Sequence, residues 1–193
     1  MIDLLLDSSN IDLSVGLAKE GKVIDYTSYE AWQCQSEYMI QEIDKLLTKH
    51  YLSKDDLGGV IVNVGPGSYT GIRISLTIAK VTCLALGIPL YALSSFRALQ
   101  KDLEPSICLM NARSNRSYIG VYDKDVILTD GIMTNDEVKD YIASHPEYVV
   151  CGETKYLGIE GYKNNIIEEM NLLKDKAEKY EDPLGVKPIY LKD

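Results

Sequence analysis

Apolar residues at the start of the chain follow the patterns of β-strands. Ile2–Leu6 is apolar except for Asp3, a pattern typical of a strand buried on both faces. Apolar positions alternate with small or polar ones from Leu13 to Leu17, and another strand-like run, Val23–Tyr29, follows a Glu20–Gly21 turn. The pattern therefore predicts three consecutive short strands.

The periodicity then changes to that of helices. Between Cys34 and His50, apolar residues recur along one side of a helix, with polar residues opposite. Leu57–Val64 is predicted to be a further strand, and Ile72–Leu86 a second helix that Gly87 ends as a C-cap. Three strands followed by alternating helix and strand predict an α/β protein with a mixed sheet of the ribonuclease-H type, the building block of the actin and sugar-kinase fold.

The predicted helix Ile72–Leu86 carries two apolar stripes. One stripe comprises Ile72, Leu76, Ala79, Cys83 and Leu86, and the opposite one comprises Ile74, Ile78, Val81 and Ala85. A helix with two stripes is covered on two sides. Either the helix is fully buried in its own domain, or one stripe contacts the sheet and the other a partner subunit. Helix phase alone does not assign the stripes.

Pro105 is the predicted boundary between two lobes, residues 1–104 and residues 105–193. A strand at Leu90–Leu93 and a helix from Ser94 to about Leu103 precede it. The residues after it predict a smaller α/β lobe, with strands near 107–110, 117–122, 126–128 and 148–151 and a helix over 135–144. A charged helix near Glu168–Lys179 and an apolar tail at Val186–Leu191 complete the prediction.

Composition limits the function. The 193 residues carry a net charge of −9, and both halves of the chain are acidic, which argues against direct binding to a nucleic-acid backbone. The first residues have no basic segment, and Lys80, Gly87 and Pro89 interrupt the longest apolar stretch, so we expect neither a signal peptide nor a membrane span. Four widely spaced cysteines without a CxxC pair predict buried thiols in a reducing cytoplasm, with no disulfide framework or zinc site.

A glycine-rich turn before the second helix is the most distinctive local motif. It comprises Gly65, Pro66, Gly67, Ser68, Tyr69, Thr70 and Gly71, and Arg73 follows within the helix. A strand, a glycine loop and a helix N-terminus together can hold an anion. The spacing, however, matches neither the P-loop pattern GxxxxGK[ST] nor the dinucleotide pattern GxGxxG. The other interpretation is a tight strand-to-helix turn that needs glycine at positive φ.

Four segments in order resemble the TsaB family, formerly called YeaZ. They are LLLDSS (Leu4–Ser9), VGPGSYTGIRIS (Val64–Ser75), NARSNRSYIGVY (Asn111–Tyr122) and KPIYLKD (Lys187–Asp193). Three positions depart from the family pattern: Asn111 replaces an Asp, Gln35 replaces a His, and Lys192 replaces the Arg of the tail.

The resemblance implies a two-lobed actin-like ATPase fold and a role in forming N6-threonylcarbamoyladenosine in tRNAs that read ANN codons. It implies a non-catalytic scaffold that pairs with the transferase paralogue TsaD and works with the ATPase TsaE, meeting tRNA indirectly through the complex. No catalytic, metal-binding or cofactor-binding residue is expected. Family members also self-associate through the first helices, so a homodimer and a nucleotide trapped at the interface stay open.

The same resemblance suggests which residues contact the partner. They are the apolar positions Met39, Ile43, Leu46 and Leu47 of the first helix and Ile74, Ile78, Val81 and Ala85 of the second. Gln35 and Met39 stand where the transferase paralogue has an H-x-x-x-H metal motif, and neither is a suitable ligand for a hard or borderline cation.

Two enzymatic alternatives stay open beside the scaffold. A metal-dependent, glycoprotease-like peptidase needs two or three convergent ligands, and no HExxH or HxxxH occurs. An ATP-dependent, sugar-kinase-like enzyme needs phosphate-binding glycines, which the hairpin Asp7–Asp12 lacks, although Asp7 is a candidate contact to a metal–phosphate unit. His50 and His145 lie at predicted helix ends and are expected to cap or pack there.

Overall fold

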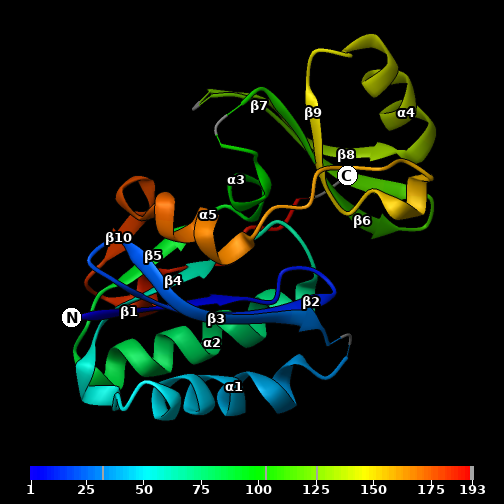
Figure 1. Ribbon diagram of the computed structural model, residues 1–193. Helices are drawn as coiled ribbons and strands as arrows, with labels where there is room; N and C mark the ends of the chain where they lie inside the picture. Colours follow the sequence, from blue (N-terminus) through cyan, green and yellow to red (C-terminus); the bar gives the residue numbers. More distant parts are fainter. Residues whose placement is uncertain (32, 103, 125, 192–193) are drawn as a thin grey trace.

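The computed structural model describes residues 1–31, 33–102, 104–124 and 126–191, and two mixed β-sheets organise them (Figure 1). The first sheet consists of β1 (Ile2–Asp7), β2 (Asp12–Lys19), β3 (Lys22–Glu30), β4 (Leu57–Asn63), β5 (Leu90–Leu93) and β10 (Glu178–Tyr180). The second consists of β6 (Ser106–Arg113), β7 (Arg116–Asp123), β8 (Val126–Thr134) and β9 (Val149–Gly152). The predicted α/β class with two mixed sheets is confirmed.

The strand order of the first sheet is β10-β5-β4-β1-β2-β3. The predicted opening meander is present, because β1, β2 and β3 pair antiparallel in sequence order, with Leu4 opposite Leu17. On its other side β1 pairs parallel with β4, with Leu4 opposite Val60, and β4 pairs parallel with β5. All six residues of β1 are buried, as its mostly apolar sequence predicted.

Helices α1 (Gln35–Lys49) and α2 (Tyr69–Leu86) cover one face of this sheet (Figure 1). Helix α2 begins three residues earlier than predicted, because the Ser68 hydroxyl accepts a hydrogen bond from the Gly71 N–H at 3.2 Å and caps the helix. Gly87 ends α2 in the left-handed conformation at φ 65°, as predicted. Of the two apolar stripes, the one containing Ile72, Leu76, Ala79 and Cys83 faces the sheet.

Helix α2 is the one helix in the described part of the chain that is long and apolar enough to cross a membrane by length and composition. Core helices of globular domains share this property, and the sheet-facing side of α2 is packed on β4.

Two short helices, α3 (Ser95–Leu99) and α5 (Ile166–Leu172), lie on the opposite face of the first sheet (Figure 1). Helix α3 is shorter than predicted: Gln100 already has an extended backbone, and its side-chain amide donates to Glu104 O and Lys124 O. The predicted helix end, Leu103, lies outside the described residues.

The second sheet has the order β8-β7-β6-β9, with α4 (Asn135–Ser144) packed on β7 and β8. Helix α4 has the predicted bounds, and its start is fixed by a capping box. Thr134 Oγ1 accepts the Glu137 N–H, while the Glu137 carboxylate accepts the Thr134 N–H at 2.8 Å.

The prediction of one charged helix over residues 168–179 is wrong. Helix α5 ends at Leu172, a 3₁₀ turn spans Lys174–Lys176, and β10 pairs antiparallel with β5 of the first sheet. Apolar packing decides this: Ile167, Met170 and Leu173 are buried in the cluster between the sheets, and Gly16 on β2 leaves room for Ile167. The second sheet begins just after Pro105, but residues 166–180 return to the first sheet, so the second lobe does not run continuously to residue 193.

Three further 3₁₀ turns complete the described elements, at Lys54–Asp56, Lys155–Leu157 and Pro183–Gly185. The last of them begins the segment 183–191, which we call the C-terminal strap because it crosses α2 and the glycine loop.

Candidate partner-binding face and glycine loop

The glycine loop is packed tightly against the hairpin that joins β1 to β2. The Ser68 N–H donates to Ser9 O at 2.6 Å, and the Ser8 hydroxyl donates to Gly71 O at 2.7 Å. A Cβ atom added to Gly67 would collide with Ser9 O, and one added to Gly71 would collide with Ser8 O. Gly65 and Gly67 also have positive φ, at 115° and 149°. Close backbone packing and positive φ therefore explain the glycines, which favours the tight-turn interpretation.

The C-terminal strap closes the other side of this loop. The Ile189 N–H donates to Val64 O at 2.7 Å, and a Cβ atom added to Gly65 would collide with Ile189 O. Farther along α2, Lys80 Nζ donates to Val186 O at 2.5 Å. Hairpin, glycine loop and strap thus form one junction at the N-terminal end of α2.

Arg73 links α2 to the strap through two tyrosines. Its guanidinium carbon lies 3.9 Å from the ring centroid of Tyr69, and its Nε donates to the Tyr190 hydroxyl at 2.9 Å. The two rings are themselves 5.0 Å apart. The sequence marked Arg73 and Tyr69 as parts of a loop motif but did not predict this contact with the tail. The only sequence feature that could have suggested this contact is the presence of a tyrosine in both the loop and the tail, Tyr69 and Tyr190.

Asp7 is fully buried beneath the hairpin. Its Oδ1 accepts the Asn63 side-chain amide at 2.9 Å and the Ser9 N–H at 3.2 Å. Burial raises the pKa of Asp7, with these hydrogen bonds opposing the shift. The carboxyl group is thus tied to the hairpin and to β4.

A cavity of about 210 Å³ lies between the two lobes, bounded by the hairpin, the glycine loop and the end of β6. Glu153 lines it, and its carboxylate accepts the Asn111 N–H at 2.9 Å. Burial raises the pKa of Glu153. Asn111, which replaces the family's usual Asp, closes a turn by accepting the Arg113 N–H at 2.9 Å.

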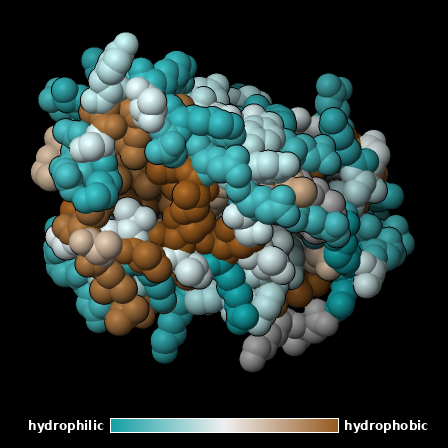
Figure 2. All heavy atoms as spheres, turned by 90° about the horizontal axis from the view of Figure 1, so that it is seen from below, coloured by the Kyte–Doolittle hydropathy of each residue, from teal (hydrophilic) through white to brown (hydrophobic). Residues whose placement is uncertain are grey.

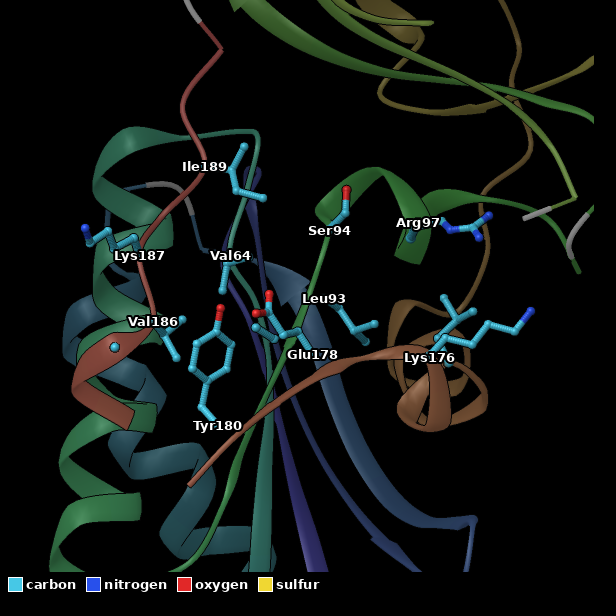
Figure 3. Close-up of a pocket in the computed structure, with 13 residues that line it drawn as sticks. Val64, Leu93, Ser94, Arg97, Lys176, Glu178, Tyr180, Val186, Lys187 and Ile189 are labelled. Atoms are coloured by element: carbon cyan, nitrogen blue, oxygen red, sulfur yellow. The ribbon is translucent and has the colours of Figure 1, made fainter. Parts of the chain in front are cut away.

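A larger cavity of about 530 Å³ lies between the strap, β5 and β10 (Figure 3). Tyr180 and Glu178 of β10 point toward Val64, while Arg97 of α3 and Ser94, the residue that precedes α3, lie on the opposite side (Figure 3). Arg97 donates to Gln100 Oε1 at 2.9 Å and to Lys124 O at 2.6 Å, so its guanidinium holds α3 to the loop after β7. Arg97 therefore stabilises the contact between α3 and this loop in addition to lining the cavity.

Neither histidine stands beside a group of metal ligands. His50 Nε2 lies 2.7 Å from Asp25 Oδ2 at the C-terminal end of α1, and His145 Nδ1 lies 2.8 Å from Tyr141 O at the end of α4. In the described part of the chain, no group of three or more His, Cys, Asp or Glu residues could hold a metal ion. Gln35 is buried and donates to Asn10 O at 3.3 Å, and Met39 is buried in the core.

The structure places three of the eight predicted partner-contact residues in the core. Met39, Leu46 and Leu47 of α1 are buried against the first sheet, because the strongest apolar stripe of α1 covers the sheet itself. Three further residues, Ile43, Ile74 and Ile78, are half-buried and pack against the same core. Only Val81 and Ala85 of the predicted set are exposed.

The exposed aliphatic residues of α1 and α2 form what we call the helix face, and they are Ile40, Val81, Leu84 and Ala85. Val81 is 60% exposed, Ile40 55% and Leu84 50%. Figure 2 shows this side of the molecule, where apolar side chains gather among polar ones. The sequence placed Leu84 between the two stripes and did not predict it as a contact. Exposed apolar patches of this kind mark interaction surfaces.

Comparison with known proteins agrees with these features. A family model described as "TsaD: tRNA N6-adenosine threonylcarbamoyltransferase" matches residues 30–148. The tRNA threonylcarbamoyladenosine biosynthesis protein TsaB of Buchnera aphidicola is 33% identical over 148 residues, covering 72% of this chain and 69% of that protein. The TsaB protein of Bacillus subtilis is 28% identical, covering 100% of this chain and 94% of its own. The chain belongs to the TsaB (YeaZ) family.

A solved structure shows the same fold. YeaZ from Pseudomonas aeruginosa superposes with a TM-score of 0.77 at 18% sequence identity, covering 98% of this chain and 99% of that one. Three of the four TsaB-family segments meet in this structure: the hairpin contains the end of Leu4–Ser9, the glycine loop begins Val64–Ser75, and the strap holds Lys187–Leu191. Lys192, where the family has Arg, and Asp193 lie outside the described residues.

Proposed function

We propose that this chain is a non-catalytic scaffold and activator in the biosynthesis of N6-threonylcarbamoyladenosine in tRNA, acting in the cytoplasm by dimerising with a TsaD-type transferase. A TsaE-type ATPase would join the pair, and tRNA would be met through the complex. Support for the pathway comes from relatives named TsaB and described as threonylcarbamoyladenosine biosynthesis proteins. The acidic charge of −9 fits a subunit that leaves the phosphate contacts to its partner.

The helix face is the observation that carries the proposal. Ile40 comes from α1 while Val81, Leu84 and Ala85 come from α2, so two adjacent helices present apolar side chains together. Each of these side chains would lose water on docking, at about 25 cal/mol per Å² of apolar surface. Two helices side by side also offer grooves into which a partner's helices can pack.

A TsaD-type partner fits this face because the two proteins share a fold. The transferase family model matches residues 30–148, a range that includes both α1 and α2. A partner with the same fold would present an equivalent pair of helices, and the two pairs would form a four-helix interface. A second copy of this chain would offer the same pair, so a homodimer is the competing state when TsaD is absent.

Three features support a role without catalysis. Backbone atoms of neighbouring segments occupy the space beside the loop glycines. The Asp7 carboxyl group accepts hydrogen bonds from Asn63 and Ser9. By the family resemblance, Gln35 and Met39 stand at the positions of the paralogue's metal motif, and both are buried. A metal-dependent peptidase would need convergent ligands with an open coordination position. An ATP-dependent enzyme would need free backbone N–H groups around the phosphates.

Light scattering on size-exclusion peaks tests the proposal, with the chain alone and mixed with the TsaD-type protein of the same genome. We expect a mixed peak with the mass of one copy of each. The variant Val81→Glu places a charge on the helix face and should abolish that peak. Val126→Glu on β8 is the matched control, because Val126 is also 60% exposed but lies on the second sheet.

Two outcomes would overturn the proposal: no mixed peak with or without nucleotide, or equal loss of the peak in both variants. Circular dichroism on each variant confirms that the fold is retained. A functional readout follows from the same pair, because Val81→Glu should remove activation of the transferase while Val126→Glu leaves it unchanged.

A further inference from the structure

Two of the four cysteines face each other across neighbouring strands. Cys108 on β6 and Cys151 on β9 are direct partners in the parallel register. They are 43 positions apart in the sequence, and their spacing gives no sign of a pair. Both are free thiols, and both are fully buried in the cluster that includes Phe96, Leu99 and Met110.

The geometry suits a disulfide bond. Adjacent strands lie about 4.7–4.9 Å apart, and a disulfide needs Cα atoms about 4.4–6.8 Å apart. Register partners on parallel strands carry their side chains on the same side of the sheet, which brings the two sulfur atoms together. The Cys151 thiol donates a hydrogen bond to Val149 O at 3.7 Å on its own strand, and the Cys108 thiol is its register partner on the neighbouring strand.

The two thiols differ in reactivity. The neighbouring Cys108 thiol, and next Ser106 and Lys101, hold the pKa of Cys151 below its usual value, while burial raises the pKa of Cys108 well above it. Cys151 is thus suited to attack an oxidant first, and Cys108 to resolve the product.

Because both thiols are buried, an oxidant would reach them when the edge strand of the second sheet opens locally. Strand β9 is four residues long and stands at the end of the order β8-β7-β6-β9. On its outer side the described residues supply only an isolated bridge between Cys151 and Tyr162. Short edge strands with few partners open at much lower free energy than central strands.

We propose that Cys108 and Cys151 are a modification site at which hydrogen peroxide forms a reversible disulfide between β6 and β9. The Cys151 thiolate attacks one peroxide oxygen, the O–O bond breaks, and a sulfenic acid forms on Cys151 as the other oxygen leaves with a proton as water. The Cys108 sulfur then attacks the Cys151 sulfur, the S–O bond breaks, and the Cys108 proton leaves with hydroxide as a second water. Two thiols are oxidised and one hydrogen peroxide is reduced to two waters, and a dithiol reductant reverses the change.

The bond would stiffen the contact between the lobes. Strand β9 ends one residue before Glu153, whose carboxylate accepts the Asn111 N–H and which lines the same inter-lobe cavity as Ile11 of the hairpin. Fixing β9 to β6 would therefore fix the position of Glu153 between the lobes. This inference rests on the second sheet alone and holds whether or not the chain binds TsaD.

Peptide mapping of the oxidised native protein tests the proposal. The reduced full chain is treated with hydrogen peroxide, alkylated in denaturant and digested without reductant. We expect alkylatable thiols to fall from four to two, a peptide pair linked through Cys108 and Cys151, and recovery of all four thiols with dithiothreitol. Cys34→Ser, which removes a thiol outside the pair, is the matched control and should still form the bond, whereas Cys151→Ser should not.

The proposal is overturned if the native protein keeps four alkylatable thiols, or if the linked peptides contain Cys34 or Cys83. A urea-unfolded sample treated identically is the second control. Equal yields of the Cys108–Cys151 bond in unfolded and native protein would show that the fold does not favour formation of this bond. Should Cys151→Ser fail to fold, the mapping of the unmodified chain decides the question without it.

Discussion

Arg73 on α2 donates a hydrogen bond to the hydroxyl of Tyr190 at 2.9 Å, although the two residues are 117 positions apart in the chain. The contact fastens the C-terminal strap over the glycine loop, where the Ile189 N–H also bonds to Val64 O. Two of the family's motifs are therefore parts of one structural unit.

Arg73→Ala should loosen the strap without unfolding the protein. Loss of the guanidinium removes the stacking on Tyr69 and the bond to Tyr190, so the Ile189 amide should exchange its hydrogen faster. Hydrogen exchange followed by mass spectrometry checks this on peptides from residues 183–191. Thr77→Ala, at an exposed position one helical turn away, is the control; an equal effect from that variant would contradict the role of Arg73.

Gly71→Ala should destabilise the fold although it places alanine in a helix. Alanine in place of glycine usually stabilises a helix by about 0.5–1 kcal/mol. Here the new Cβ would collide with Ser8 O, so we expect the free energy of unfolding to fall by about 1–3 kcal/mol, the range for overpacked sites. Urea unfolding measures it. Gly131→Ala, with open space around its Cβ, should change little, and a stabilised Gly71→Ala variant would refute the packing argument.

Glu169 should make stability fall as pH rises from about 4.5 to about 7. Burial, and next the charge of Asp102, raise the pKa of Glu169 to about 7 from an ordinary value near 4.5. Between these values the folded chain keeps a proton that the unfolded chain releases, so its contribution to stability is complete below the window and lost above it. Glu169→Gln should flatten this part of the urea-midpoint profile, whereas Glu160→Gln, at an exposed position that does not contribute to the shift, should leave it unchanged.

Met39→Ala should lower the free energy of unfolding by about 2–5 kcal/mol, the usual range for a buried methionine. Met39 is fully buried between α1 and the first sheet, so the loss is one of core packing. Val81→Ala, at an exposed position of α2, should stay within about 0.5 kcal/mol. Thermal or urea unfolding of both variants gives the comparison, and equal effects would contradict the division between core and helix face.

Local patterns predicted most of the elements, because their causes are local. Neighbouring residues determine the mostly apolar pattern of β1, the capping box at the start of α4 and the end of α2 at Gly87. The charged segment 168–179 was mispredicted because its pairing partner, β5, lies far away in the sequence. Its charges favoured a helix, while burial of Ile167 and Met170 and pairing along β5 determined the outcome.

The candidate site was predicted at the level of helices but not of individual side chains. Periodicity separates the two sides of α1 and α2, yet it does not say which side meets the sheet. Met39 belongs to the core for that reason, and Leu84, which no stripe included, is exposed. The contact between Arg73 and Tyr190, and the pairing of Cys108 with Cys151, both depend on chain segments that only the tertiary fold brings together.

The return of the chain to its first sheet also shapes how the protein is made. Strand β5 can pair with β4 once both have left the ribosome, but its other edge pairs with β10, which is synthesised much later. During that interval a growing chain exposes an unpaired strand edge, and such edges recruit other strands. Early binding of a chaperone at β5 would therefore protect the nascent first lobe until its own last strand arrives.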